Sequence, residues 1–172
     1  MSLESLIEQF PFLKDLKSQE LIFESDRDHS LAAVIVKSNL PYSPGVYFVF
    51  NHSIGYEDQL LYVGIAGADK NGNINTHQLP KRLLAVCYPP KKYFEGITKK
   101  HLSRNELWPE MMKKDEISTI KILCFFSPIG EDYKVEKGKI PLELEKLINA
   151  KLKEQNISQP WSKRHNYEIS IL

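Results

Sequence analysis

Runs of apolar residues predict strands in two parts of the chain. Residues 45–51 (GVYFVFN) are mostly β-branched or aromatic and contain no breaker, so even-numbered side chains would face one side of a sheet and odd-numbered ones the other. The polar turn at 52–58 leads to a second run at 59–66, and such a short connection predicts an antiparallel hairpin. Residues 118–127, with an apolar end, predict a third strand.

Helical spacing of apolar residues flanks these strands. Residues 2–24 favour a helical segment that covers one face of the sheet, with a packing or dimerisation arm as the alternative. Residues 79–86 and 141–155 predict two further helices, each with a proline near its first turn. Residues 31–36 suit a helix or a strand, and residues 88–116 are expected to be irregular.

Composition narrows the class of protein. A chain of 172 residues with 42% hydrophobic residues suits one domain with its own core. The net charge of +1 gives no whole-chain field, so a nucleic-acid binder would need local basic patches. Cys87 and Cys124 lie in apolar stretches without zinc spacing, as buried thiols of a reducing compartment would. Neither a secretory signal nor a membrane-spanning run is visible, so we expect a cytoplasmic protein without a membrane partner.

Arg82 is the first candidate for chemistry. It lies beside the stripe formed by Leu79, Leu83 and Val86 on its helix. A guanidinium directed at a sheet needs an acceptor or an anion. A structural salt bridge is the plainer interpretation, and a bound phosphate is the functional one.

The helix at 141–155 offers a carboxylate. Leu144, Ile148 and Leu152 mark its apolar face, and Leu147 lies alongside. Glu145 lies beside this stripe, and Glu143 is the competing candidate because it stands four residues before Leu147. A carboxylate near a buried face is costly unless it is paired or binds a metal, although most such residues reach water at the edge.

Two tyrosines lie on neighbouring predicted strands. Tyr47 and Tyr62 could simply pack across the hairpin. Gly64, however, leaves room beside Tyr62 for a close approach. A phenol can relay or accept a proton where nearby cations favour its ionised form.

Taken in order, four segments resemble the motifs of one enzyme superfamily. They are Gly45-Val46-Tyr47, Tyr62-Val63-Gly64, Leu79-Pro80-Lys81-Arg82-Leu83 and Leu144-Glu145-Lys146-Leu147-Ile148. Together they resemble the GIY-YIG nuclease superfamily, with valine in place of isoleucine in the first two. The ordered set is more specific than either triplet alone, and it covers residues 44–156.

The resemblance implies a fold class and a domain organisation. It implies an α/β (α+β) domain with a small three-stranded, mostly antiparallel sheet flanked by helices. Residues 1–43 would form an N-terminal helical arm and residues 44–156 the nuclease core. Residues 88–116 would be a basic insertion in that core, and residues 157–172 a basic tail that packs on it.

The resemblance also implies roles for individual residues. Glu145, or Glu143 because the spacing of this motif is one residue tighter than usual, would hold one Mg²⁺ (or Mn²⁺). Arg82 would stabilise charge on the phosphate. Tyr47 and Tyr62 would line the site, and one of them, preferably Tyr62, would help to activate water.

The chain departs from the family pattern at one basic group. Many members carry a histidine one turn after the arginine, where this chain has Val86. Lys70 or His77, in the polar loop at 67–78, could enter the site in its place. Members often carry an asparagine after the glutamate helix, for which Asn149 and Asn156 are candidates.

The expected substrate is double-stranded DNA. Basic residues that could contact it are Lys91, Lys92, Lys99, Lys100, Arg104, Lys163 and Arg164. A compact chain with no recognisable second domain is most similar to a type II restriction endonuclease, which would favour a homodimer. The alternatives are a structure-specific repair or mobile-element nuclease and a catalytically inactive DNA-binding module. An unrelated α/β protein with chance triplets would instead place Tyr62 and Arg82 far apart.

Overall fold

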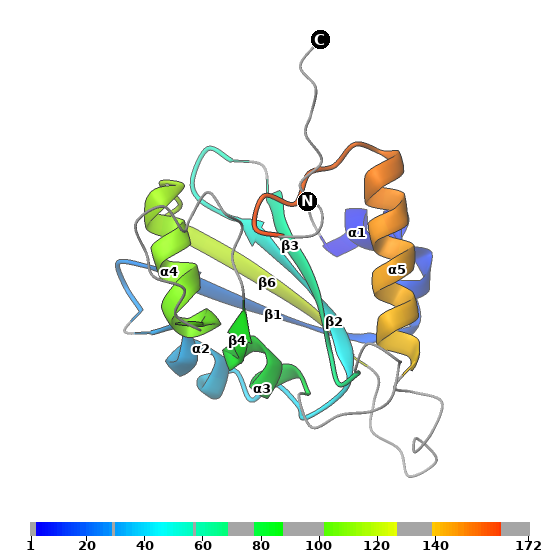
Figure 1. The fold of residues 1–172 in the computed structure, drawn as a ribbon, viewed down its shortest axis with the longest axis horizontal. Coiled ribbons are helices and arrows are strands. Elements are labelled where there is room, and N and C mark those ends of the chain that lie inside the picture. The colour runs from blue at the N-terminus through cyan, green and yellow to red at the C-terminus, as the bar shows by residue number, and fades with distance from the viewer. Residues whose placement is uncertain are drawn as a thin grey trace.

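A four-stranded antiparallel sheet forms the centre of the molecule. The computed structural model describes residues 3–28, 30–56, 58–68, 78–87, 102–126 and 139–162. The strands are β1 (Lys17–Glu24), β2 (Gly45–Asn51), β3 (Gln59–Ala66) and β6 (Thr119–Phe126), in the order β1-β6-β2-β3 (Figure 1). The predicted hairpin at 45–66 and the third predicted strand are therefore confirmed, as is the α+β class.

The prediction of three strands is wrong by one, because the N-terminal segment is not helical throughout. It forms α1 (Leu3–Gln9), a 3-10 helix η1 (Pro11–Asp15) and then β1, which pairs with β6 over its whole length. Leu21 and Phe23 of β1 are buried while their neighbours are more exposed, the two-residue alternation of a strand with one buried face. The N-terminal segment therefore contributes β1 to the central sheet and is not helical throughout its described residues.

Helices cover both faces of the sheet (Figure 1). One face carries α2 (Leu31–Lys37), α3 (Leu79–Leu84) and α4 (Arg104–Lys114), and the other carries α1, η1 and α5 (Lys139–Glu154). A small second sheet pairs β4 (Val86–Cys87) with β5 (Leu102–Ser103).

The expectation that residues 88–116 are irregular is wrong for the described part of that stretch. A capping box starts α4, because the Glu106 carboxylate accepts hydrogen bonds from the backbone N–H and the hydroxyl of Ser103. Leu107, Trp108 and Met111 are buried at helical spacing. This segment is therefore a packed element of the fold.

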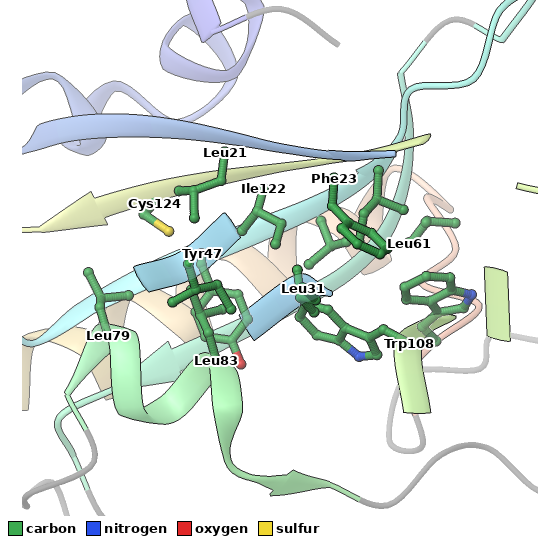
Figure 2. Packing of buried hydrophobic residues seen from close by; sticks show 14 of the residues in the cluster. Leu21, Phe23, Leu31, Tyr47, Leu61, Leu79, Leu83, Trp108, Ile122 and Cys124 are labelled. Carbon is green, nitrogen blue, oxygen red and sulfur yellow. The ribbon is translucent and has the colours of Figure 1, made fainter. Parts of the chain in front are cut away.

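Side chains on β2 alternate between two apolar clusters, as the sequence predicts. Val46, Phe48 and Phe50 pack with α1 and α5, whereas Tyr47 and Val49 pack with the helices of the other face. Figure 2 shows Tyr47 pointing from β2 toward α3, where Leu79 and Leu83 lie. We refer to these as the α1–α5 face and the α2–α4 face.

The cysteine prediction is confirmed at one position. Cys124 is a free thiol with no exposed surface, and its burial raises its pKa well above the ordinary value. The side chain of Cys87 lies outside the described part of the structure. Among the helices in the described ranges, none has the length and apolar character to cross a membrane.

Candidate active site

Tyr47 and Gly64 fit together across the β2–β3 hairpin. Tyr47 has no exposed surface, and its phenol lies over Gly64 of β3. A Cβ atom on Gly64 would lie 2.4 Å from both Cζ and the hydroxyl oxygen of Tyr47. Only glycine allows this approach, so the close approach that the sequence indicates at Gly64 is present, and Tyr47 is the residue that makes it.

Tyr62 lies on the same face as Tyr47, because it pairs with Val49 in the regular part of the hairpin, and a β-bulge follows this pair. The register between β2 and β3 shifts after Val49, which pairs with Tyr62, so that Phe50 pairs with Leu60 and Leu61 is the extra residue. The rings of Tyr47 and Tyr62 have centroids 6.0 Å apart and are inclined by 36°. Tyr62 is only half-buried, so its ring borders both the apolar cluster and solvent.

Arg82 is anchored on the edge of the same strand. Its helix buries Leu79 and Leu83 completely, which turns the half-buried Arg82 toward β3. The Nε–H of Arg82 donates to the carbonyl oxygen of Ile65 at 3.1 Å. Ile65 follows Gly64, so the guanidinium and both phenols gather around residues 62–65 of β3. Tyr62 and Ile65, which accepts the hydrogen bond from Arg82, are thus three residues apart on the same strand.

The outer edge of β3 is occupied at two further positions by the segment that follows α5. The Val63 N–H donates to Oε1 of Gln159 at 3.1 Å, and the Trp161 N–H donates to the Leu61 carbonyl at 3.0 Å. β3 is an edge strand, and alternate residues direct their N–H and C=O groups outward. The outward groups of Leu61, Val63 and Ile65 are thus met in order by Trp161, Gln159 and Arg82.

Glu145 lies on α5, the helix of the α1–α5 face that packs next to β3. Ile148 and Leu152 are buried and mark the side of α5 that packs on the sheet. Asn149, the residue after Ile148, accepts a hydrogen bond from Nε2 of Gln159 at 2.9 Å. Glu145 precedes Asn149 by four residues, so it lies on the same side of the helix, one turn closer to the N-terminus. The start of α5 and the end of β3 lie at the same end of the sheet (Figure 1). Glu145 lies one helical turn from Asn149 toward this end of the sheet. From Val63, the residue linked to Asn149 through Gln159, Ile65 lies in the same direction along β3, and Ile65 anchors Arg82.

The competing carboxylate faces elsewhere. Glu143 is exposed, whereas Glu145 is half-buried. Leu147, four residues after Glu143, is 56% exposed. Leu147, which the sequence places alongside the apolar face, is therefore exposed, and the side of α5 that carries Glu143 faces solvent.

Arg104 is not a surface residue, contrary to the sequence prediction that it contacts DNA. It is 2% exposed, and its Nη1 donates to the carbonyl oxygens of Arg82 at 2.9 Å and Ala85 at 3.0 Å. Its guanidinium also lies 5.9 Å from the ring centroid of Trp108. Arg104 thus satisfies carbonyl groups at the C-terminal end of α3, the helix that carries Arg82.

Sequence reasoning missed the roles of Gln159 and Arg104. Gln159 has no exposed surface, although it lies in a segment that was expected to be a basic tail. Its partner Val63 is 96 residues away, so no local periodicity reveals the contact. Tryptophan at position 161 was the available signal, because a large aromatic residue in a polar tail predicts a buried anchor.

Several predicted site residues lie outside the described part of the structure. They are Lys70, His77, Lys91, Lys92, Lys99, Lys100, Lys163 and Arg164. Within the described ranges, no group of three or more histidine, cysteine, aspartate or glutamate side chains could hold a metal ion. A cation at Glu145 would therefore need ligands beyond the described side chains, such as water and substrate oxygens.

Comparison with known proteins gave no match to any family model, curated protein or solved structure.

Proposed function

We propose that this protein is a metal-dependent DNA endonuclease whose active site is formed by Tyr47, Tyr62, Arg82 and Glu145. The observation that carries the proposal is the anchoring of Arg82 on Ile65 of β3, the strand that carries Tyr62 and against which the Tyr47 phenol packs. A half-exposed cation and a half-exposed phenol on one strand, backed by a buried phenol, suit an anionic substrate that must be held and attacked by water.

The guanidinium has the geometry of a phosphate clamp. The hydrogen bond from Nε fixes its plane at the strand edge, and a guanidinium carries four further N–H donors on its two Nη atoms. Fixed donors directed at the oxygens of a phosphodiester stabilise the charge that develops during hydrolysis. Tyr62, the more exposed of the two phenols, is the better candidate to take a proton from the attacking water.

The residues present fit a Mg²⁺ or Mn²⁺ ion that has few protein ligands. Glu145 is half-buried on the side of α5 that turns toward the β3 edge, and a hard cation commonly binds one or two carboxylates together with water and substrate phosphates. Such an ion, when bound, polarises a phosphate oxygen and lowers the pKa of water. Glu145 is preferred over Glu143, because Glu143 lies on the exposed side of the helix with Leu147.

Within this class, sequence-specific cleavage of double-stranded DNA by a homodimer, as in a type II restriction enzyme, is the form we favour. A dimer would let two copies of one active site address both strands of a palindromic sequence. Cleavage confined to branched or damaged DNA would indicate a structure-specific nuclease instead.

Digestion of large DNAs of known sequence, with and without Mg²⁺, tests the proposal. Wild-type protein is compared with Arg82→Ala and Glu145→Ala, and Glu143→Ala is the matched control from the same helix. We expect discrete Mg²⁺-dependent fragments, a loss of roughly 10²–10³-fold in rate for Arg82→Ala, and near-wild-type cleavage by Glu143→Ala.

The outcomes separate the candidates. Fragments that survive Glu145→Ala but not Glu143→Ala would move the metal ligand to Glu143. Binding of DNA without cleavage of linear or branched substrates, by a folded protein in Mg²⁺ or Mn²⁺, would support an inactive binding module. That result would overturn the proposed activity.

A further inference from the structure

Gln159 lies where the two sides of the candidate site are joined. Its side chain has no exposed surface and forms two hydrogen bonds, one with the backbone of β3 and one with a side chain of α5. A buried amide with both ends satisfied holds its partners at a defined separation, because breaking either bond leaves a polar group unpaired.

The direction of both hydrogen bonds follows from the backbone. The Val63 N–H can only donate, so it must face Oε1 of Gln159. Nε2 is then the donor toward Asn149, and Asn149 must present Oδ1. The chain of contacts from β3 through Gln159 to α5 therefore has a single orientation.

The segment that carries Gln159 is itself anchored on α4 and β3. The Trp161 N–H bonds to Leu61, and Nε1 of Trp161 donates to the Asp115 carboxylate at 2.9 Å. The ring centroids of Trp161 and Trp108 are 6.0 Å apart. The Ser162 N–H donates a hydrogen bond to the Gln159 carbonyl oxygen at 2.9 Å, which forms a turn. These contacts hold Gln159 independently of its contact with Asn149.

We infer that Gln159 is a positioning residue for Glu145, acting through Asn149. This inference rests on the proposed function. Asn149 is one helical turn from Glu145 on the same side of α5, and Val63 is two residues from Ile65, which holds Arg82. The link from Val63 through Gln159 to Asn149 therefore fixes the position of Glu145 relative to Arg82 along β3. A small misplacement of reacting groups lowers the reaction rate strongly.

A purely structural role predicts a different result. If Gln159 only stabilised the fold, its loss would lower the free energy of unfolding without changing the turnover of folded protein. If it positions Glu145, kcat falls while KM for DNA stays constant, because DNA contacts elsewhere are untouched.

Four variants separate the two roles. Gln159→Met keeps the length of the side chain but removes both hydrogen bonds, and Asn149→Leu removes only the bond to α5. Asn149→Asp keeps the acceptor for Nε2 of Gln159. Gln155→Met is the matched control, since the amide of Gln155 pairs with Gln9 of α1 rather than with β3.

The measurements are kcat and KM for DNA, unfolding by urea, and hydrogen exchange of the Val63 amide. We expect kcat to fall about 10–100-fold in Gln159→Met and Asn149→Leu, the range typical of residues that orient a metal ligand. We expect Asn149→Asp and Gln155→Met to retain most of the wild-type kcat. Exchange at Val63 should accelerate in Gln159→Met but not in Asn149→Leu.

Wild-type kcat in Asn149→Leu would overturn the inference, even if Gln159→Met fails to fold. An equal fall of kcat in Asn149→Asp and Asn149→Leu would also overturn it, because the retained acceptor should restore turnover. An inactive wild-type protein would instead reject the proposed function itself, so the two failures are distinguishable.

Discussion

The α1–α5 face of the sheet is packed with phenylalanine and aliphatic residues, whereas the α2–α4 face also carries Tyr47, Tyr62, Trp108 and the buried Arg104. On the first face, Phe48 contacts other apolar rings, among them Phe10, Phe50 and Phe125. On the α2–α4 face, the ring of Tyr62 lies next to those of Tyr47 and Trp108. The buried Arg104 on this face donates a hydrogen bond to the Arg82 carbonyl. Both faces are equally buried along β2, so burial alone does not distinguish them.

The difference lies in what each face delivers to the edge of β3. The α2–α4 face brings Arg82, fixed by a directional hydrogen bond to Ile65, and the two tyrosines, which are placed by ring packing around Gly64. The α1–α5 face brings α5, whose packing is non-directional, and a polar link through Asn149 and Gln159 then fixes its position. Mutations on the α1–α5 face should therefore change mainly the free energy of unfolding. Mutations on the α2–α4 face should change both the free energy of unfolding and kcat.

Phe48→Ala should give the largest effect on stability. Phe48 is 1% exposed, and truncation of a buried phenylalanine costs about 3–5 kcal/mol of unfolding free energy. We expect a large drop in the urea midpoint, with unchanged kcat at a temperature where the variant is folded. Tyr47→Phe, on the other face, is the comparison: it keeps the ring and should lower kcat more than stability. A lower kcat for folded Phe48→Ala would show that the faces are not separable.

Arg104→Leu should lower both stability and cleavage. The substitution removes Nη1 of a buried cation, which bonds to the carbonyls of both Arg82 and Ala85, and a hydrogen bond from a charged group is worth roughly 1.5–3 kcal/mol. Because these carbonyls end the helix that carries Arg82, we expect a lower kcat alongside the lower urea midpoint. Arg27→Leu is the matched control, since Arg27 is 71% exposed and pairs only with Glu24 among the described ion pairs. An unchanged kcat in folded Arg104→Leu would contradict the link between the end of α3 and the site.

The hairpin was predictable because its signals are local. Strand boundaries at 45–51 and 59–66 follow from β-branched and aromatic runs that end in polar residues. β1 was missed because Leu21 continues an apparent helical spacing from Leu13 and Leu16, and its strand pattern becomes decisive only through pairing with β6. Tertiary pairing overrode local propensity there.

The sequence selects Tyr47, Tyr62 and Arg82 as candidates, but it does not give their arrangement, and their roles stay predictions. In the structure the two tyrosine rings lie side by side, and Arg82 bonds to Ile65 of β3. Arg104 was wrongly placed on the surface because it follows a lysine-rich stretch, where a buried arginine has no local signature. Contacts between residues far apart in sequence depend on how the elements pack.

Gly64→Ala should give a smaller effect that depends on Tyr47. The added methyl group would overlap the Tyr47 phenol, and overpacking of this kind costs about 1–3 kcal/mol. In a Tyr47→Leu background most of the overlap disappears, so we expect Gly64→Ala to cost less there in urea unfolding. The nearby Tyr62 ring leaves a residual cost. Strict additivity of the two changes would mean that Tyr47 does not occupy the space above Gly64.

Lowering the pH should give the smallest effect on the free energy of unfolding. The change tests the ion pair of Lys121 and Asp58 at the end of the α1–α5 face. Lys121 is 5% exposed beside Phe50 and pairs with the Asp58 carboxylate, which also bonds to His52. Burial raises the pKa of Asp58. The hydrogen bonds with Lys121 and His52 lower it by more than burial raises it, so the net pKa lies below its ordinary value of 3.8.

A lowered pKa in the folded state fixes the sign of the pH dependence. The contribution of Asp58 is fully present above its unfolded pKa and is lost as the pH falls through the folded value. For a single carboxylate, the free energy of unfolding should fall by at most about 1.4 kcal/mol per pH unit. Urea unfolding of the wild type and of an Asp58→Asn/Lys121→Met variant, between about pH 5 and 3, measures this slope. The double variant removes both charges and leaves neither unpaired, so its curve should be flatter. Equal slopes would show that this pair does not stabilise the end of the face.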